Sequence, residues 1–281
     1  MARNTRYVHG TAPREQRRLT LLNQIMNEPC LREMHLQRGD HVVDFGAGLG
    51  QLSRGMARLV GRRGRVVGIE FSAEQIAEAR RQAAEAGESK LVDLREGDVG
   101  DPPLGSGEWG QFDVAHARFI LEHVADPLRV VKQMLRAVKP GGRILLADDD
   151  HDVLRLWPEP RGISEVWRAY MRTYDRLGND PYIGRRLVQM LHQAGAIPVR
   201  NTWIFFGACS GQPAFPALVE NLARVLEGAC DTIVDAGMTE RESFDDAMRE
   251  LRAWGKRPDA AIWFSICWAE GVKAKATRRR S

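Results

Sequence analysis

Residues 41–51 read HVVDFGAGLGQ, and this stretch decides the fold. The apolar run His41–Phe45 is typical of a short buried strand. Three glycines follow it, at positions 46, 48 and 50. Glycine lets the chain turn sharply and allows a ligand to approach the backbone closely. Because open α/β sheets bind ligands outside the carboxyl ends of their strands, we predict a ligand site at this glycine loop, Gly46–Gly50.

The spacing of the glycines distinguishes two kinds of nucleotide site. A dinucleotide fingerprint requires G-x-G-x-x-G. The sixth position is Gln51 when counted from Gly46, and Ser53 when counted from Gly48. An acidic residue, Asp44, also stands two positions before the first glycine. This form is typical of sites that hold a nucleoside with an amino-acid tail, so we expect no pyrophosphate here.

Acidic residues also end the next two expected strands. Glu70 closes the strand Arg65–Glu70 and could accept hydrogen bonds from both hydroxyls of a ribose, while Phe71 could lie against an adenine ring. Asp98 and Val99 follow the third strand and could bind the adenine edge. A single acid in such a place is more often an ordinary surface residue. Three acids at successive strand ends, behind a glycine loop, favour a nucleoside site.

Strands and helices alternate along the chain as far as about residue 150. Further strands are expected at 65–70, 91–96, 112–117 and 143–147, and a last one at 262–268. Helices are expected at 51–60, 72–86 and 126–138. This alternation predicts a parallel sheet covered by helices on both faces.

Segments outside this alternation also have helical patterns. Thr11–Asn27 carries apolar residues at helical spacing, and we expect that helix to end at the Glu28-Pro29 step because the residue before a proline avoids the helical region. Helical additions are expected at about 152–182 and 213–258. Aromatic residues in and near the additions could line an apolar pocket or form ordinary core: Trp157, Trp167, Tyr170, Tyr174, Tyr182 and Trp203.

Taken together, these stretches resemble the class I S-adenosylmethionine (SAM)-dependent methyltransferases, most of all the ubiquinone- and menaquinone-biosynthesis and related small-molecule subgroup. The matching stretches are VVDFGAGLG at 42–50, VVGIEFS at 66–72, EGDV at 96–99, FDVAHARFILEHVADP at 112–127 and VKPGGRILLADDD at 138–150. Their order and spacing are specific over about residues 36–150, and later residues are similar only in general.

The resemblance implies an α/β fold with a doubly wound, Rossmann-like, mostly parallel seven-stranded sheet. Residues 1–35 would form an N-terminal helical cap. Residues 36–281 would form the SAM-binding domain, and its helical insertions at about 152–182 and 213–258 would form a substrate lid.

The resemblance also implies the cofactor, SAM, and its product, S-adenosylhomocysteine. Gly46, Gly48 and Gly50 would carry the methionine end of the cofactor. Asp44, Gln51 and Arg118 would lie near that end, Glu70 would hold the ribose with Phe71 beside it, and Asp98 and Val99 would contact the adenine. The segment around Tyr7 would fold over the cofactor.

Methyl transfer is an in-line displacement at a sulfonium, so the protein mainly aligns the acceptor and excludes water. An oxygen acceptor of high pKa also needs a general base. Among His116, His123, Asp149 and His151, we predict His123 and Asp149 as catalytic residues; a structural role or a cofactor contact for His123 stays open. The run Asp148–Asp152 holds four acids in five positions. It is either a solvated turn, or a site for a cationic substrate or for a metal that bridges to an anionic one.

The composition limits the class of protein. The chain has 281 residues, 43% hydrophobic and 28% charged, with a net charge of +4, which is ordinary for a soluble globular protein. We find no membrane span and no apolar signal region, so the cytoplasm is the expected compartment. The basic tail with Arg278–Arg280 is expected to be solvated, and we expect no nucleic-acid partner. The four cysteines lack metal-ligand spacing, and no metal ligands are assigned.

These features predict a SAM-dependent methyltransferase that acts on an oxygen or carbon of a small-molecule acceptor, in specialised or quinone-like metabolism. The fourth strand ends in HARF at 116–119 and not in an N-P-P-Y motif, which argues against an adenine-N6 or glutamine methyltransferase. Two alternatives stay open: a methyltransferase acting on RNA or protein, and a SAM-binding protein without transfer activity. A homodimer is compatible with the sequence.

Overall fold

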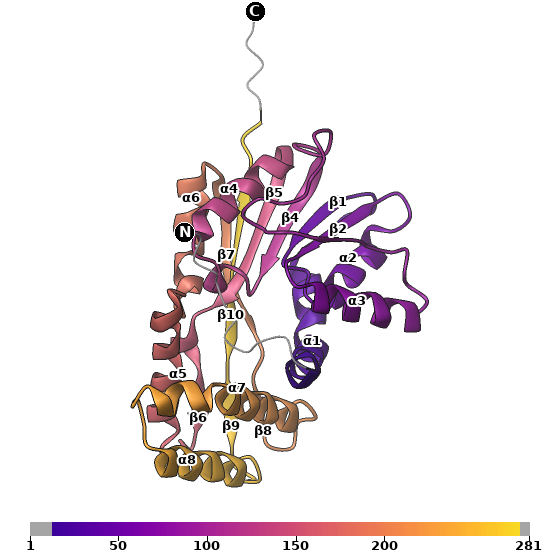
Figure 1. The fold of residues 1–281 in the computed structure, drawn as a ribbon. Coiled ribbons are helices and arrows are strands. Elements are labelled where there is room, and N and C mark those ends of the chain that lie inside the picture. Colours follow the sequence, from indigo (N-terminus) through magenta and orange to yellow (C-terminus); the bar gives the residue numbers. More distant parts are fainter. Residues whose placement is uncertain (1–12, 276–281) are drawn as a thin grey trace, which may run out of the picture.

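The computed structural model describes residues 13–275, and a seven-stranded sheet forms its centre (Figure 1). The strand order is β3-β2-β1-β4-β5-β10-β7. The strand β10 runs antiparallel to both of its neighbours, β5 and β7, and the other neighbouring pairs are parallel. The predicted mostly parallel, seven-stranded α/β sheet is confirmed. Its strands are β1 (His41–Phe45), β2 (Arg65–Glu70), β3 (Asp93–Glu96), β4 (Phe112–Arg118), β5 (Val138–Asp149), β7 (Ile197–Phe205) and β10 (Ser265–Val272).

Helices cover both faces of the sheet. Successive strand residues point to opposite faces, so each face carries apolar side chains that pack against helices. Val42 of β1 belongs to one core, with α1 and α2, and Val43 belongs to the other, with α4 and α6. Two predicted helix starts are confirmed, since Ser72 and Asp126 cap α3 and α4 by accepting backbone N–H bonds. The helices are α1 (Pro13–Glu33), α2 (Gln51–Val60), α3 (Ala73–Glu85), α4 (Pro127–Ala137), α5 (Ile163–Leu177), α6 (Leu187–Ala194), α7 (Phe215–Asp235) and α8 (Arg241–Trp254).

The first helix is longer than predicted. It continues through Pro29 to Glu33, so the expected end at the Glu28-Pro29 step is wrong. Proline removes one helical hydrogen bond, but packing on either side outweighs that loss. Met26 and Cys30, on either side of Pro29, are both buried, as is Met34 directly after the helix, so the helix buries one continuous face across the proline.

A second, three-stranded sheet lies beyond the large one, and it was not predicted (Figure 1). Its strands β6 (Arg155–Trp157), β9 (Ala261–Trp263) and β8 (Ala208–Cys209) pair in the order β6-β9-β8. Each lies close in the chain to a strand of the large sheet: β6 follows β5, β8 follows β7, and β9 precedes β10. The single last strand predicted at 262–268 is therefore divided at Phe264.

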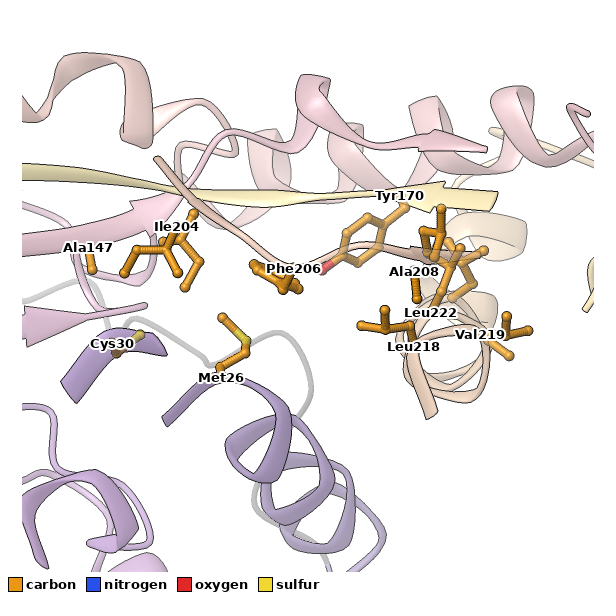
Figure 2. Close-up of a cluster of buried hydrophobic side chains, with 14 of the residues drawn as sticks. Met26, Cys30, Ala147, Tyr170, Ile204, Phe206, Ala208, Leu218, Val219 and Leu222 are labelled. Atoms are coloured by element: carbon orange, nitrogen blue, oxygen red, sulfur yellow. The ribbon is translucent and has the colours of Figure 1, made fainter. Parts of the chain in front are cut away.

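The inserted helices pack around this second sheet and against α1. Helix α5 contacts both α7 and α8, and α7 contacts α1. Figure 2 shows Met26 of α1 on the same cluster as Phe206, with Leu218 and Leu222 of α7 beyond it. One apolar core therefore extends from the large sheet into the insertions.

Within the described part of the chain, none of the helices combines the length and the hydropathy that a membrane span requires. Tyr7 and the basic residues Arg278–Arg280, which carried two of the expectations above, lie outside the described residues.

Candidate functional site

The glycine loop is held against the end of β2. The N–H groups of Gly46 and Ala47 both donate to the carbonyl of Ile69, at 2.8 Å, and the N–H of Gly48 donates to Oε2 of Glu70 at 2.9 Å. Gly46 has a φ of +81°, and a Cβ atom there would overlap the side chain of Ile120. Both the conformation and the close contact therefore require glycine at this position.

Glu70 is the carboxylate that organises this edge. Its other oxygen, Oε1, accepts the N–H of Ser72 at 2.9 Å, and the residue is only 8% exposed. Burial raises the pKa of Glu70, against the backbone N–H bonds from Ser72 and Gly48, which lower it. Each carboxylate oxygen can accept more than one hydrogen bond. Glu70 can thus hold the loop and still receive ligand hydroxyls.

Asp44 lies at the end of β1 but is fully engaged by the protein. Its Oδ2 accepts the hydroxyl of Ser53 at 2.5 Å, and its Oδ1 lies 2.8 Å from Nδ1 of His116. Asp44 is 2% exposed and His116 is completely buried. This carboxylate ties β1 to β4 and to α2, a geometry that favours a positioning role over direct contact with a ligand.

The other residues predicted around the nucleoside lie near the ends of β2 and β3. The N–H of Gly97 donates to the carbonyl of Glu70, which joins the two strand ends. Phe71 is 69% exposed, Asp98 is exposed and accepts the N–H of Gly100, and Val99 is buried. A ligand could therefore reach the Phe71 ring and the Asp98 carboxylate.

Arg118 and Gln51 reach other helices. The Arg118 guanidinium donates to Asn23 and Asn27 of α1, at 2.6 and 2.9 Å, and so fastens α1 to the end of β4. The Gln51 amide donates to Gln82 of α3 at 2.6 Å. Both side chains have protein partners, so their predicted contact with the methionine end stays a prediction.

The segment 119–123 follows β4 and has an unusual backbone. Phe119 has a φ of +55°, a conformation that bulky residues rarely adopt and that is often found at functional sites. Asp148 fixes the segment, because its Oδ2 accepts the N–H groups of Ile120 and Leu121, at 3.2 and 2.8 Å. Asp148 is completely buried, and its pKa is raised well above the ordinary value by burial and by the nearby Glu122.

A cavity of about 110 Å³ lies next to this segment, between the ends of β4 and β5 and the inserted helices. It brings together the two predicted catalytic residues, His123 and Asp149. Of the predicted aromatic residues, it includes the three on α5, whereas Trp157 and Trp203 are about two-thirds exposed elsewhere. The apolar lining is Leu22, Met26, Phe119, Leu154, Phe206, Leu218, Leu222, Val225, Ile262 and Phe264, together with Trp167, Tyr170 and Tyr174.

The polar end of the cavity is built around Glu122, which the sequence analysis missed. Its Oε1 lies 3.3 Å from Nε2 of His123, and its Oε2 lies 3.1 Å from Nε2 of His151. Burial lowers the pKa of His151, against the neighbouring acids, and so favours the neutral ring. Trp167 and Tyr174 pack edge-on against that ring. Glu122 stands in the stretch ILEHV at 120–124, but an acid beside a histidine in the sequence does not indicate that the acid is buried.

Comparison with known proteins agrees with this geometry. Residues 43–146 match the family model described as a methyltransferase domain. The predicted resemblance to class I SAM-dependent methyltransferases is thus confirmed.

Individual relatives resemble parts of the chain. The 2-phytyl-1,4-beta-naphthoquinone methyltransferase of Arabidopsis thaliana is 38% identical over 114 residues, which are 40% of this chain and 42% of that protein. The chain spans about half the length of the curated relatives it matches. A SAM-dependent methyltransferase from Aquifex aeolicus has the same fold, with a TM-score of 0.51 and 22% identity over 68% of this chain and 92% of that one.

The shared fold does not by itself define the reaction. The [4+2]-cyclase SpnF aligns with 93% of this chain and 82% of its own, with a TM-score of 0.52 and 21% identity. Function must therefore be argued from the site.

Proposed function

We propose that this protein transfers the methyl group of SAM to an oxygen or carbon of a small, largely apolar acceptor. The glycine loop and Glu70 would hold the cofactor, and the cavity would hold the acceptor. The observation that carries the proposal is the segment 119–123. Ile120 packs on Gly46, while Phe119, Glu122 and His123 line the cavity, so one short segment contacts both sites.

The lining of the cavity indicates the class of acceptor. Its walls are mostly aliphatic and aromatic, and four of its polar side chains lie together: Glu122, His123, Asp149 and His151. A pocket of about 110 Å³ with this lining suits a small flat ring that carries one oxygen function. The name of the Arabidopsis relative, a naphthoquinone methyltransferase, is consistent with a quinone-like acceptor and with small-molecule metabolism.

The polar end supplies the proton chemistry. The cofactor would bring the sulfonium and its methyl group. His123 would take the proton of an acceptor hydroxyl, since an imidazole titrates near neutral pH. The Glu122 carboxylate beside it would stabilise the imidazolium that forms. Asp149, at the end of β5, would orient the acceptor, and the apolar walls would exclude water.

Calorimetry with SAM and S-adenosylhomocysteine tests the cofactor assignment. Both ligands should bind in the micromolar range, and Glu70→Ala should weaken them at least tenfold because the loop and the ribose lose their acceptor. Glu74→Ala is the matched control, since Glu74 is a fully exposed acid four residues later, in the first turn of α3. Well-folded protein that binds neither ligand would refute the proposal. Labelled SAM with a panel of hydroxyquinones and phenols would then identify the acceptor.

A further inference from the structure

Three side chains of metal-binding type meet at the polar end of the cavity. Glu122 follows β4, Asp149 ends β5, and His151 begins the short 3₁₀ helix η2 (His151–Val153). One ligand atom of each lies within 4.8 Å of the ligand atoms of the other two. Atoms at such separations can bind one ion together after small side-chain movements, because metal–oxygen and metal–nitrogen bonds are about 2.0–2.2 Å long.

The surroundings of these side chains are rich in acidic groups and poorly solvated. Glu122 is 3% exposed, and the neighbouring Asp148 is completely buried. The nearby cation Arg185 is paired with Asp150 and Asp152. A buried carboxylate is stabilised either by taking up a proton, which the raised pKa of Asp148 favours, or by a compensating positive charge, which a cation bound at Glu122 and Asp149 would provide.

His151 provides an independent indication of a ligand. Its side chain is 5% exposed and lines the cavity, and within residues 13–275 its Nδ1 has no hydrogen-bond partner. A buried ring nitrogen without a partner is costly. If Nδ1 binds the ion, it gains a partner, while Nε2 keeps its hydrogen bond to Glu122, which orients the ring.

We propose that Glu122, Asp149 and His151 bind one divalent transition-metal cation. Two carboxylates and one imidazole suit Zn²⁺ or Mn²⁺ better than Ca²⁺, which prefers oxygen ligands alone. Three protein ligands leave a coordination position open, as in catalytic metal sites. The cavity adjoins the three ligands, so that position is available to an acceptor.

The role of the ion rests on the proposed function. A hydroxyl of the acceptor would bind the ion, which lowers the pKa of that hydroxyl. The hydroxyl proton would pass to His123, and the oxygen would form a bond to the methyl carbon as the carbon–sulfur bond breaks. The electron pair of that bond would stay on sulfur, which leaves neutral S-adenosylhomocysteine.

Electron paramagnetic resonance of Mn²⁺ tests the site without methyl transfer. The probe is Mn²⁺ alone, because thiols bind this ion poorly and the cysteines should not compete for it. The ion is added to chelator-treated full-length protein that carries no affinity tag. We expect one bound Mn²⁺ per chain. We also expect Asp149→Asn and His151→Gln each to weaken binding at least tenfold.

Asp152→Asn is the matched control, because Asp152 lies in the same 3₁₀ helix but is more than half exposed and pairs with Arg185. Its affinity for Mn²⁺ should not change. Thermal unfolding without metal checks that each variant is folded. The proposal is overturned if the wild type binds no stoichiometric Mn²⁺, or if folded Asp149→Asn and His151→Gln bind as the wild type does. SAM binding without Mn²⁺ binding would refute the metal site alone, and Mn²⁺ binding without SAM binding would refute the methyltransferase proposal alone.

Discussion

Replacement of Gly46 by alanine tests the link between the glycine loop and the segment after β4. The new Cβ would need a left-handed backbone conformation and would also overlap the Ile120 side chain. The backbone conformation alone costs about 1–2 kcal/mol for a residue other than glycine. Overpacking against a side chain that cannot retreat freely adds about 1–3 kcal/mol. We therefore expect Gly46→Ala to lower the free energy of unfolding by about 2–5 kcal/mol.

Gly195→Ala isolates the first of these costs. Gly195 follows α6 in the left-handed conformation, with φ +93° and ψ 12°, and a Cβ there would make only an ordinary contact, 3.8 Å from the Leu135 side chain. This variant should lose only about 1–2 kcal/mol. A third variant, Gly46→Ala with Ile120→Ala, should recover part of the additional loss, because the overlapping side chain is removed.

Urea unfolding of the three variants, without ligand, measures these free energies, and calorimetry measures SAM affinity. Gly46→Ala should weaken SAM binding at least tenfold because the loop is displaced, and Gly195→Ala should leave it unchanged. If Gly46→Ala is no less stable than Gly195→Ala, Ile120 does not restrict the loop, and the contact between the two sites is refuted.

Four further predictions address other parts of the molecule. Because burial raises the pKa of Glu70, the folded state holds the Glu70 proton to higher pH than the unfolded chain does. The free energy of unfolding of the wild type should therefore fall, relative to that of Glu70→Gln, as the pH rises from about 4.5 through the folded-state pKa. Urea unfolding across this pH range measures the difference between the two proteins, and a wild-type advantage that grows with pH would contradict the prediction. Arg118→Met should cost about 1–3 kcal/mol and expose α1 to trypsin, because two hydrogen bonds from a charged group to that helix are lost. Alkylation followed by mass spectrometry should modify the exposed Cys209 long before Cys267, since burial raises the pKa of Cys267 to about 11; equal rates would refute that environment. Leu222→Trp, which adds bulk to the cavity wall, should abolish turnover but leave SAM affinity unchanged, and a variant with full turnover would show that the acceptor binds elsewhere.

The part of the fold that sequence predicts well is the part in which each strand is buried on both faces. Val42 and Val43 point into different cores, yet both must be apolar, so the strand appears as a continuous apolar run. The loop after it is predicted equally well, because any residue other than glycine at position 46 would be strained and would overlap Ile120. Local requirements of this kind can be recognised from the residue type at a single position in the sequence.

Features that depend on contacts between residues far apart in the sequence cannot be recognised from single positions. The strand β8 has two residues and forms only because it pairs with β9, which lies about fifty residues later. Pro29 is tolerated within α1 because Met26 and Cys30 are buried on either side of it. Glu122 is buried only because η1 (Leu121–His123) turns it toward His151, a residue of another element.

The parts of the molecule that the sequence predicts well differ from those that it does not predict, and this difference bears on the specificity for the acceptor. The match to the methyltransferase domain ends at residue 146, whereas most of the cavity wall comes from later residues on α5, α7 and the segments around β8 and β9. The proposed cofactor side thus lies within the family match, and most of the proposed acceptor side lies in residues that the match does not reach. Proteins with the same glycine loop can therefore differ in acceptor, because the walls of the cavity can change without disturbing Glu70 or Gly46. The segment 119–123 would belong to both sides, because Ile120 packs on Gly46 while Phe119, Glu122 and His123 line the cavity, so a substitution there should disturb both.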